Sequence, residues 1–282
     1  MVTFGYLLRF KNASNETFYG EVPEEIVTKG SYIGSTIPVY SQNAPWDLEF
    51  RLLDRKETIF EVLSPLPAVP IFIGVGLNYK QHAKEAKASL LPLVVIRPQD
   101  ALAGPFEDIP INPQCHAMDY EAELCFVIGK DCKNVGDDEN AMQYVLGYTA
   151  GNDVSSRYWQ MPERSGNQHG IAKSFDKFAP IGPVIASPGV IHDPHNLSIK
   201  SVVNGEIRQS ARTDDLIYDI PTIIRHVSRG TTLRKGTVVM TGTPSGVAAF
   251  MDPPAWLQDG DIVEVEIEKI GKIKNKIVFE KL

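Results

Sequence analysis

The sequence predicts a strand-rich α+β fold in which a small N-terminal domain precedes a larger one. Short apolar runs of strand length dominate the chain after residue 115, and only a few segments have a helical pattern. The segment SPLPAVP (64–70) holds three prolines, so neither a helix nor a central strand can continue through it. We therefore expect a small domain over 1–66 and the larger domain over 67–282.

The first domain has the pattern of short strands around turns. FGYLLRF (4–10) and TFYGEV (17–22) have strand composition, and the polar segment KNASNE (11–16) between them is typical of a turn. APWDLEFRLLDR (44–55) is compatible with a helix. This domain is therefore expected to be a small, mostly β unit.

The larger domain begins with a predicted buried strand at IFIGVG (71–76), followed by a helix at LNYKQHAKEAK (77–87). A further apolar strand is expected over 144–149. The Asn-Gly pair in SVVNGEIRQ (201–209) is a strong hairpin signal. DIVEVEIEK (261–269) alternates apolar and acidic residues, as a half-exposed strand does.

Composition excludes several classes of partner. The chain has 282 residues, 28 of them basic and 35 acidic, and its formal net charge is −7. Basic residues cluster only in IEKIGKIKNK (267–276), which we interpret as a solvated strand pair, so no nucleic-acid or anionic-membrane partner is expected. No apolar run is long enough for a membrane span, and the first twelve residues have neither a signal nor a transit pattern. We expect a cytoplasmic protein.

The three cysteines are Cys115, Cys125 and Cys132. Their number is odd and their spacing matches no zinc motif. They are therefore interpreted as small buried or free thiols, which fits a reducing compartment.

Two glutamates interrupt the pattern of a buried strand in MDYEAELCFVIGK (118–130). The strand is expected from Tyr120, and Leu124–Ile128 is its buried part, yet Glu121 and Glu123 lie two apart and so face the same side. Their backbones are roughly 7 Å apart, and the carboxylates repel unless a cation lies between them. Oxygen ligands favour Mg²⁺ or Mn²⁺ over zinc. The alternative is that both line the exposed face of an edge strand.

Further polar groups follow in GYTAGNDVSSRYWQ and GIAKSFDKFAPIGP. Asp153 ends an apolar stretch and is followed by Arg157 and Gln160, at a point of the kind where binding sites are often built. Asp153 alone is equally compatible with a helix N-cap. Lys173 lies in a short polar gap, and a lone lysine is usually solvated.

The block GVGLNYKQHAKEA carries a possible acid/base pair. Gly74 and Gly76 form only a GxG, with Tyr79 at the position of the third glycine, so a dinucleotide-binding loop is excluded. His82 and Glu85 are three apart on the expected helix and share a face, where the carboxylate can orient the imidazole as a general base. The alternative is an ordinary surface pair.

Six blocks together resemble one known family. GVGLNYKQHAKEA, DYEAELCFVIGK, GYTAGNDVSSRYWQM, GIAKSFDKFAPIGP, VNGEIRQ and VVMTGTPSGV occur in the order found in the fumarylacetoacetate hydrolase family. The resemblance runs from about Ile71 to the C-terminus, three quarters of the chain. It implies a mixed β-roll catalytic domain behind a small N-terminal domain, and a homodimer.

The resemblance also implies roles for particular side chains. The family pattern has an E-x-E metal pair with a third carboxylate, a lysine near the reacting oxygen, a His/Glu dyad on a lid helix and several substrate contacts. On this sequence, the implied metal ligands are Glu121, Glu123 and Asp153, the catalytic residues His82, Glu85 and Lys173, and the substrate contacts Arg97, Arg157, Gln160 and Thr243.

Three positions depart from the family pattern. Arg97 stands where a lysine is frequent, Tyr158 replaces an aspartate, and His169 stands where a tryptophan is frequent. The fixed, planar charge of Arg97 suits a carboxylate but cannot act as a proton shuttle. These changes are expected to reshape the pocket.

The implied activity is that of a Mg²⁺-dependent enzyme, with Mn²⁺ as the other candidate metal. Its substrate would be a small 2-oxo dicarboxylate, and the reaction, through a metal-stabilised enolate, would be enol/keto tautomerisation or decarboxylation of oxaloacetate. One alternative is C–C hydrolysis of an acylpyruvate or a fumarylacetoacetate-like diketo acid. The other is a metal- and oxoacid-binding protein without catalysis, for which retention of His82, Glu85 and Lys173 would be unnecessary.

Overall fold

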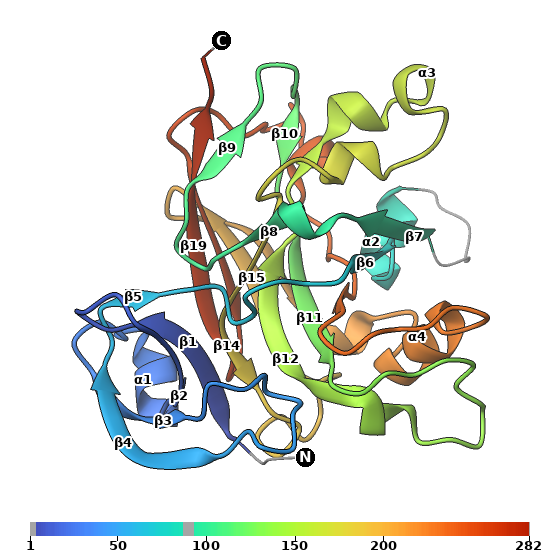
Figure 1. Cartoon of the computed structure of the whole chain (residues 1–282). Coiled ribbons are helices and arrows are strands. Elements are labelled where there is room, and N and C mark those ends of the chain that lie inside the picture. Colours follow the sequence, from blue (N-terminus) through green and yellow to red (C-terminus); the bar gives the residue numbers. More distant parts are fainter. Residues whose placement is uncertain (1–3, 87–92, 282) are drawn as a thin grey trace.

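The computed structural model describes residues 4–86 and 93–281, and two β-sheets that pack together form its centre (Figure 1). The larger sheet has twelve strands, ten of which follow one another in the order β4-β3-β2-β1-β14-β12-β11-β17-β6-β7. The remaining two, β5 and β8, pair with β1 and β14. In chain order the strands of this sheet are β1 Tyr6–Lys11, β2 Thr17–Glu21, β3 Thr36–Tyr40, β4 Leu52–Thr58, β5 Glu61–Val62, β6 Phe72–Gly76, β7 Leu93–Arg97, β8 Leu102–Ala103, β11 Ala122–Ile128, β12 Val145–Asn152, β14 Ala179–Ala186 and β17 Val238–Met240.

The second sheet has five strands in the order β16-β15-β18-β19-β9, and a third sheet is the short pair β10-β13. Most pairs are antiparallel, but β17 with β6, β14 with β8 and β19 with β9 are parallel. The sheets are therefore mixed. Their bounds are β9 Ile109–Ile111, β10 Met118–Asp119, β13 Ser155–Ser156, β15 Ser198–Val203, β16 Glu206–Arg212, β18 Ile262–Ile267 and β19 Gly271–Phe279.

The helices are short and lie outside the sheets (Figure 1). Several of these helices come directly after strands whose sequence blocks carry polar residues. Their own side chains therefore lie beside the ends of those strands. The α-helices are α1 Glu24–Lys29, α2 Lys80–Glu85, α3 Pro162–Ser165 and α4 Ile220–Val227. The 3₁₀ helices are η1 Gln99–Ala101, η2 Ala141–Tyr144, η3 Arg157–Gln160, η4 Ile171–Lys173, η5 Thr213–Asp215 and η6 Ala248–Phe250.

The main core lies between the two larger sheets. Leu124 and Val184 project from the twelve-stranded sheet, Val265 and Ile273 project from the five-stranded sheet, and none of the four is exposed. Every residue of β11 and β12 is buried, in keeping with their mostly apolar sequences, so the buried Glu123 of β11 stands out. The strand-rich α+β class predicted from the sequence is confirmed.

The register of β11 and β12 brings distant acids together. These strands are antiparallel, and Ala122 is opposite Asn152. Glu121 comes directly before that pair and Asp153 directly after it, so the two carboxylates lie at the same end of the ladder. The site therefore follows from one strand pairing in the centre of the sheet.

Several local predictions have clear outcomes. The hairpin at 201–209 is confirmed, with Asn204 and Gly205 both at positive φ between β15 and β16. The half-exposed strand at 261–269 is confirmed as β18, and the basic tail pairs with it as β19. The three cysteines are buried and free. No helix in the described part of the chain is long and apolar enough to cross a membrane.

The helix expected over 44–55 is wrong. Residues 52–58 form β4, which pairs with β3, so a backbone ladder outweighs the local helical preference. The helix expected over 77–87 is observed only as α2, and Lys87 lies outside the described residues. Strand β1 pairs with β14, which joins the N-terminal strands to the large sheet. The domain boundary at 66/67 stays a prediction.

Candidate active site and metal centre

Three buried carboxylates meet where β11 begins and β12 ends. Glu121, Glu123 and Asp153 each offer a ligand oxygen, and these oxygens all lie within 4.8 Å of one another. The residues are 6%, 2% and 3% exposed. The edge-strand interpretation of the glutamate pair is therefore wrong, because β11 is a central strand. Asp153 is followed by the short strand β13, so it is not a helix N-cap either.

Positive side chains surround the carboxylates. Lys173 Nζ lies 2.6 Å from Asp153 Oδ2 and 3.1 Å from Glu121 Oε2. Arg97 Nη2 lies 2.5 Å from the same Asp153 oxygen. Arg157 Nη2 donates to Glu121 Oε1 at 2.7 Å. Lys173 is only 6% exposed, so it is not a solvated surface lysine.

The positive charge is distributed unevenly over the cluster. Burial alone raises the pKa of Glu121, but Lys173 and Arg157 outweigh it and lower that pKa to about 2. Burial, with repulsion from Asp153 and Glu121, raises the pKa of Glu123 well above its ordinary value. Glu123 Oε2 accepts a hydrogen bond from the Gly242 backbone N–H at 2.6 Å. A further positive charge beside Glu123 would relieve this repulsion.

An unpaired carboxylate oxygen in the cluster also indicates a positively charged ligand. Asp153 Oδ1 is buried and has no hydrogen-bond partner among the described residues. Buried polar atoms are normally paired, so this orphaned oxygen indicates a ligand that the protein itself does not supply. Three carboxylates form an all-oxygen donor set, which suits Mg²⁺ or Mn²⁺. The cluster therefore fits a divalent cation.

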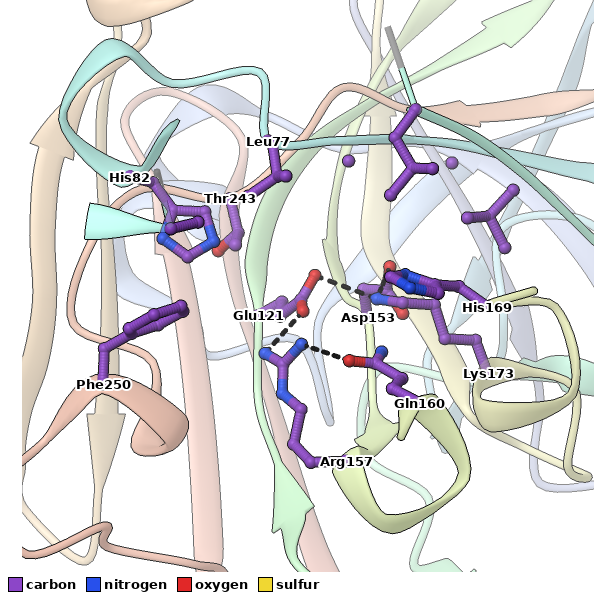
Figure 2. A pocket seen from close by; sticks show the side chains of 15 residues that line it. Leu77, His82, Glu121, Asp153, Arg157, Gln160, His169, Lys173, Thr243 and Phe250 are labelled. Carbon is purple, nitrogen blue, oxygen red and sulfur yellow. Dashed lines mark hydrogen bonds and ion pairs between the residues drawn. The ribbon is translucent and has the colours of Figure 1, made fainter. Parts of the chain in front are cut away.

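His82 lies across a small cavity from Glu121 and Asp153 (Figure 2). His82 is 4% exposed, and its Nδ1 lies 3.3 Å from Glu85 Oε2. The imidazole ring and the Phe250 ring pack edge to face. The Glu85 side chain is 39% exposed. His82 is thus buried and held from two sides, which the surface-pair interpretation does not allow.

The cavity has a volume of about 190 Å³, which suits a ligand of few heavy atoms. Glu85, Glu123 and Arg97 do not line it but lie behind residues that do. His169 also lines it, and burial followed by the charges of Lys173 and Arg157 lowers its pKa. The predicted site residues that line it are His82, Glu121, Asp153, Arg157, Gln160, Lys173 and Thr243.

Two of these lining residues keep a hydrogen bond free. Gln160 Oε1 accepts from Arg157 Nη1 at 2.9 Å, but its Nε2 is buried and has no partner among the described residues. Thr243 Oγ1 accepts from Gln209 Nε2 at 2.8 Å, so its own O–H remains available as a donor. Both groups can donate to an acidic ligand.

Sequence reasoning missed two buried residues that position the site. Asp119 accepts from Arg157 Nε at 2.8 Å and from the backbone N–H groups of Ala248 and Ala249, so it joins Arg157 to η6. Gln209 accepts from the Ala122 N–H at 3.0 Å while it donates to Thr243. A signal for Asp119 was present, since D-x-E-x-E extends the glutamate alternation by one position. Nothing in the sequence distinguished Gln209.

Fold and site together define a strand-rich α+β protein with a buried acidic centre, suited to a divalent cation, beside a small polar cavity. The family model described as fumarylacetoacetate (FAA) hydrolase C-terminal matches residues 71–278. The chain belongs to the fumarylacetoacetate hydrolase family.

Two relatives illustrate the similarity in sequence. The fumarylacetoacetate hydrolase domain-containing protein 2 homolog of Dictyostelium discoideum is 42% identical over 216 residues, which cover 73% of this chain and 70% of that protein. The human protein named oxaloacetate tautomerase FAHD2A, mitochondrial, is 39% identical over 229 residues, which cover 80% and 72%.

Solved structures share the fold over nearly the whole chain. The 5-carboxymethyl-2-hydroxymuconate delta-isomerase from Mycobacterium smegmatis superposes with a TM-score of 0.82 at 30% identity, covering 98% of this chain and all of that one. A structure described as Cg1458 with inhibitor gives a TM-score of 0.84 at 30% identity, with the same coverage.

Proposed function

We propose that the protein is a divalent-metal-dependent enzyme that interconverts the enol and keto forms of oxaloacetate. The observation that carries the proposal is the buried carboxylate cluster with its orphaned Asp153 oxygen, which faces a cavity lined on its other side by His82. Relatives named oxaloacetate tautomerase and a structural neighbour named as an isomerase support this reaction class.

The proposed ligands are Glu121, Glu123 and Asp153, with Mg²⁺ as the first candidate and Mn²⁺ as the second. A bound divalent cation would supply Lewis-acid stabilisation of a developing enolate oxygen. Lys173 Nζ, which already lies against two of these carboxylates, would add positive charge at the same place.

The remaining side chains would bind the dianion and move its proton. In the keto-to-enol direction, His82, oriented by Glu85, would take a proton from C3 while the C2 oxygen gains one from water. In the reverse direction, the C2 hydroxyl would lose its proton to water and the protonated His82 would donate one to C3. Arg157, Gln160 Nε2 and the Thr243 hydroxyl line the cavity and would hold the substrate carboxylates. Arg97 is fully buried behind Asp153, so we assign it an indirect part.

The test is to add purified protein to enol oxaloacetate with Mg²⁺, with and without EDTA, and to follow ultraviolet loss of the enol and pyruvate formation in the same samples. We expect fast enol loss without pyruvate, abolished by EDTA. Pyruvate at a matching rate would mean decarboxylation instead. If neither occurs, the acylpyruvate hydrolase alternative is tested next, and if that substrate is not turned over either, calorimetry with Mg²⁺ and oxalate tests the alternative of a binding protein.

The assembly and location of the protein also rest on inference. We infer a homodimer from the family resemblance, and sedimentation at the 31.2 kDa mass of one chain would contradict it. The cytoplasmic location stays a prediction from the sequence, and the names of two relatives include "mitochondrial".

A further inference from the structure

The two oxygens of Asp153 have different surroundings. Its Oδ2 is contacted by two cations, Arg97 Nη2 at 2.5 Å and Lys173 Nζ at 2.6 Å. Its Oδ1 is buried without a hydrogen-bond partner among the described residues. Oδ1 is therefore free to bind a metal ion, whereas Oδ2 is already paired with two cations.

Of these two cations, Arg97 has Asp153 as its single ion-pair partner among the described residues. Its side chain is 0% exposed. It ends β7, which pairs with β6, and a Cβ added at Gly74 of β6 would lie 3.3 Å from Arg97 Nη2 and 3.9 Å from Asp153 Oδ2. Gly74, which has no side chain, thus leaves room for the guanidinium beside this one oxygen. Lys173 also contacts Glu121, so its single ammonium charge is shared between the two carboxylates.

We propose that Arg97 is a positioning residue that limits Asp153 to a single metal-binding oxygen and thereby makes the site prefer Mg²⁺ over Ca²⁺. Magnesium takes six ligands in near-ideal octahedral geometry, whereas calcium takes six to eight and accepts bidentate carboxylates. A carboxylate that offers only Oδ1 suits the smaller ion. The inference rests on the proposed metal site and adds the residue that sets its selectivity.

The family resemblance places a lysine at this position, so Arg97 also provides a natural comparison. Arginine keeps its charge at all working pH values and has a planar group with five donors, while lysine has a compact ammonium on a flexible stem. Selectivity for the smaller ion is therefore expected to be stronger with arginine than with lysine.

The experiment is isothermal titration calorimetry of the metal-free full chain with Mg²⁺ and with Ca²⁺, for the wild type, Arg97→Met and Arg97→Lys. Loss of a nearby positive charge should tighten binding of both divalent ions alike, so the ratio of the two dissociation constants isolates the geometric effect. We expect the wild type to prefer Mg²⁺, Arg97→Met to shift the ratio towards Ca²⁺ by about tenfold or more, and Arg97→Lys to lie between them.

Two results would overturn the inference. One is a ratio unchanged in Arg97→Met although both affinities change, which would make Arg97 only a source of charge. The other is a wild type that prefers Ca²⁺. Absence of binding of either ion to the wild type is a distinct outcome, because it removes the proposed metal centre itself. Far-ultraviolet circular dichroism of each variant checks that the fold is kept, and Arg97→Lys supplies the comparison if Arg97→Met fails to fold.

Discussion

Replacing His82 by alanine is expected to lower kcat for oxaloacetate tautomerisation by about 10²–10⁴-fold, the range usual for loss of a general acid/base group. The imidazole lines the cavity opposite the carboxylate cluster and is oriented by Glu85 and Phe250. None of the proposed metal ligands contacts it directly through a hydrogen bond or ion pair in the described chain. Binding of oxalate in the presence of Mg²⁺, measured by calorimetry, should therefore stay close to that of the wild type.

His192→Ala is the matched control, since this histidine is exposed and lies outside the cavity lining. It should keep wild-type kcat and oxalate binding. Glu85→Gln removes only the orienting charge and should have a smaller effect on kcat than His82→Ala. Wild-type turnover by His82→Ala would show that the proton is moved by another group.

Replacing Glu123 by glutamine is expected to abolish stabilisation of the protein by Mg²⁺. At a metal concentration one hundred times Kd, binding to the folded state alone raises the free energy of unfolding by about 2.7 kcal/mol. In a chain of this size, that is a rise in Tm of about 5 °C. The glutamine keeps an oxygen that can accept from the Gly242 N–H but carries no charge.

Differential scanning fluorimetry with and without Mg²⁺ measures the effect. Without metal, Glu123→Gln should unfold at a temperature no lower than the wild type, because the neutral amide replaces a carboxyl whose ionisation is disfavoured by burial and by Asp153 and Glu121. The control Glu49→Gln changes an exposed glutamate and should keep the full Mg²⁺ response. A Tm rise in Glu123→Gln equal to that of the wild type would exclude Glu123 as a ligand.

Much of the site could be predicted because its chemistry is concentrated in short blocks. Glu121 and Glu123 stand out as charges in an otherwise apolar strand, and His82 with Glu85 has helical spacing. What brings Asp153 to the glutamates is the pairing of Ala122 with Asn152, a contact between distant parts of the chain that local patterns do not encode. The family resemblance supplied that link.

Other features depended on tertiary contacts alone. Gln209 reaches Thr243 because β16 lies beside the segment after β17, and its sequence context is that of an ordinary hairpin strand. Residues 44–55 are compatible with a helix, but residues 52–55 belong to β4, which pairs with β3. The substrate contact expected for Arg97 stays a prediction; in the structure Arg97 pairs with Asp153 and does not line the cavity, a placement that depends on the pairing of β7 with β6.

The most direct measurement of the central claim is anomalous X-ray diffraction from crystals soaked in Mn²⁺, recorded near the manganese absorption edge. We expect one strong anomalous peak in contact with oxygens of Glu121, Glu123 and Asp153, with Asp153 binding through Oδ1. Soaked crystals with no anomalous density between these carboxylates, or with manganese bound only elsewhere, would contradict this expectation.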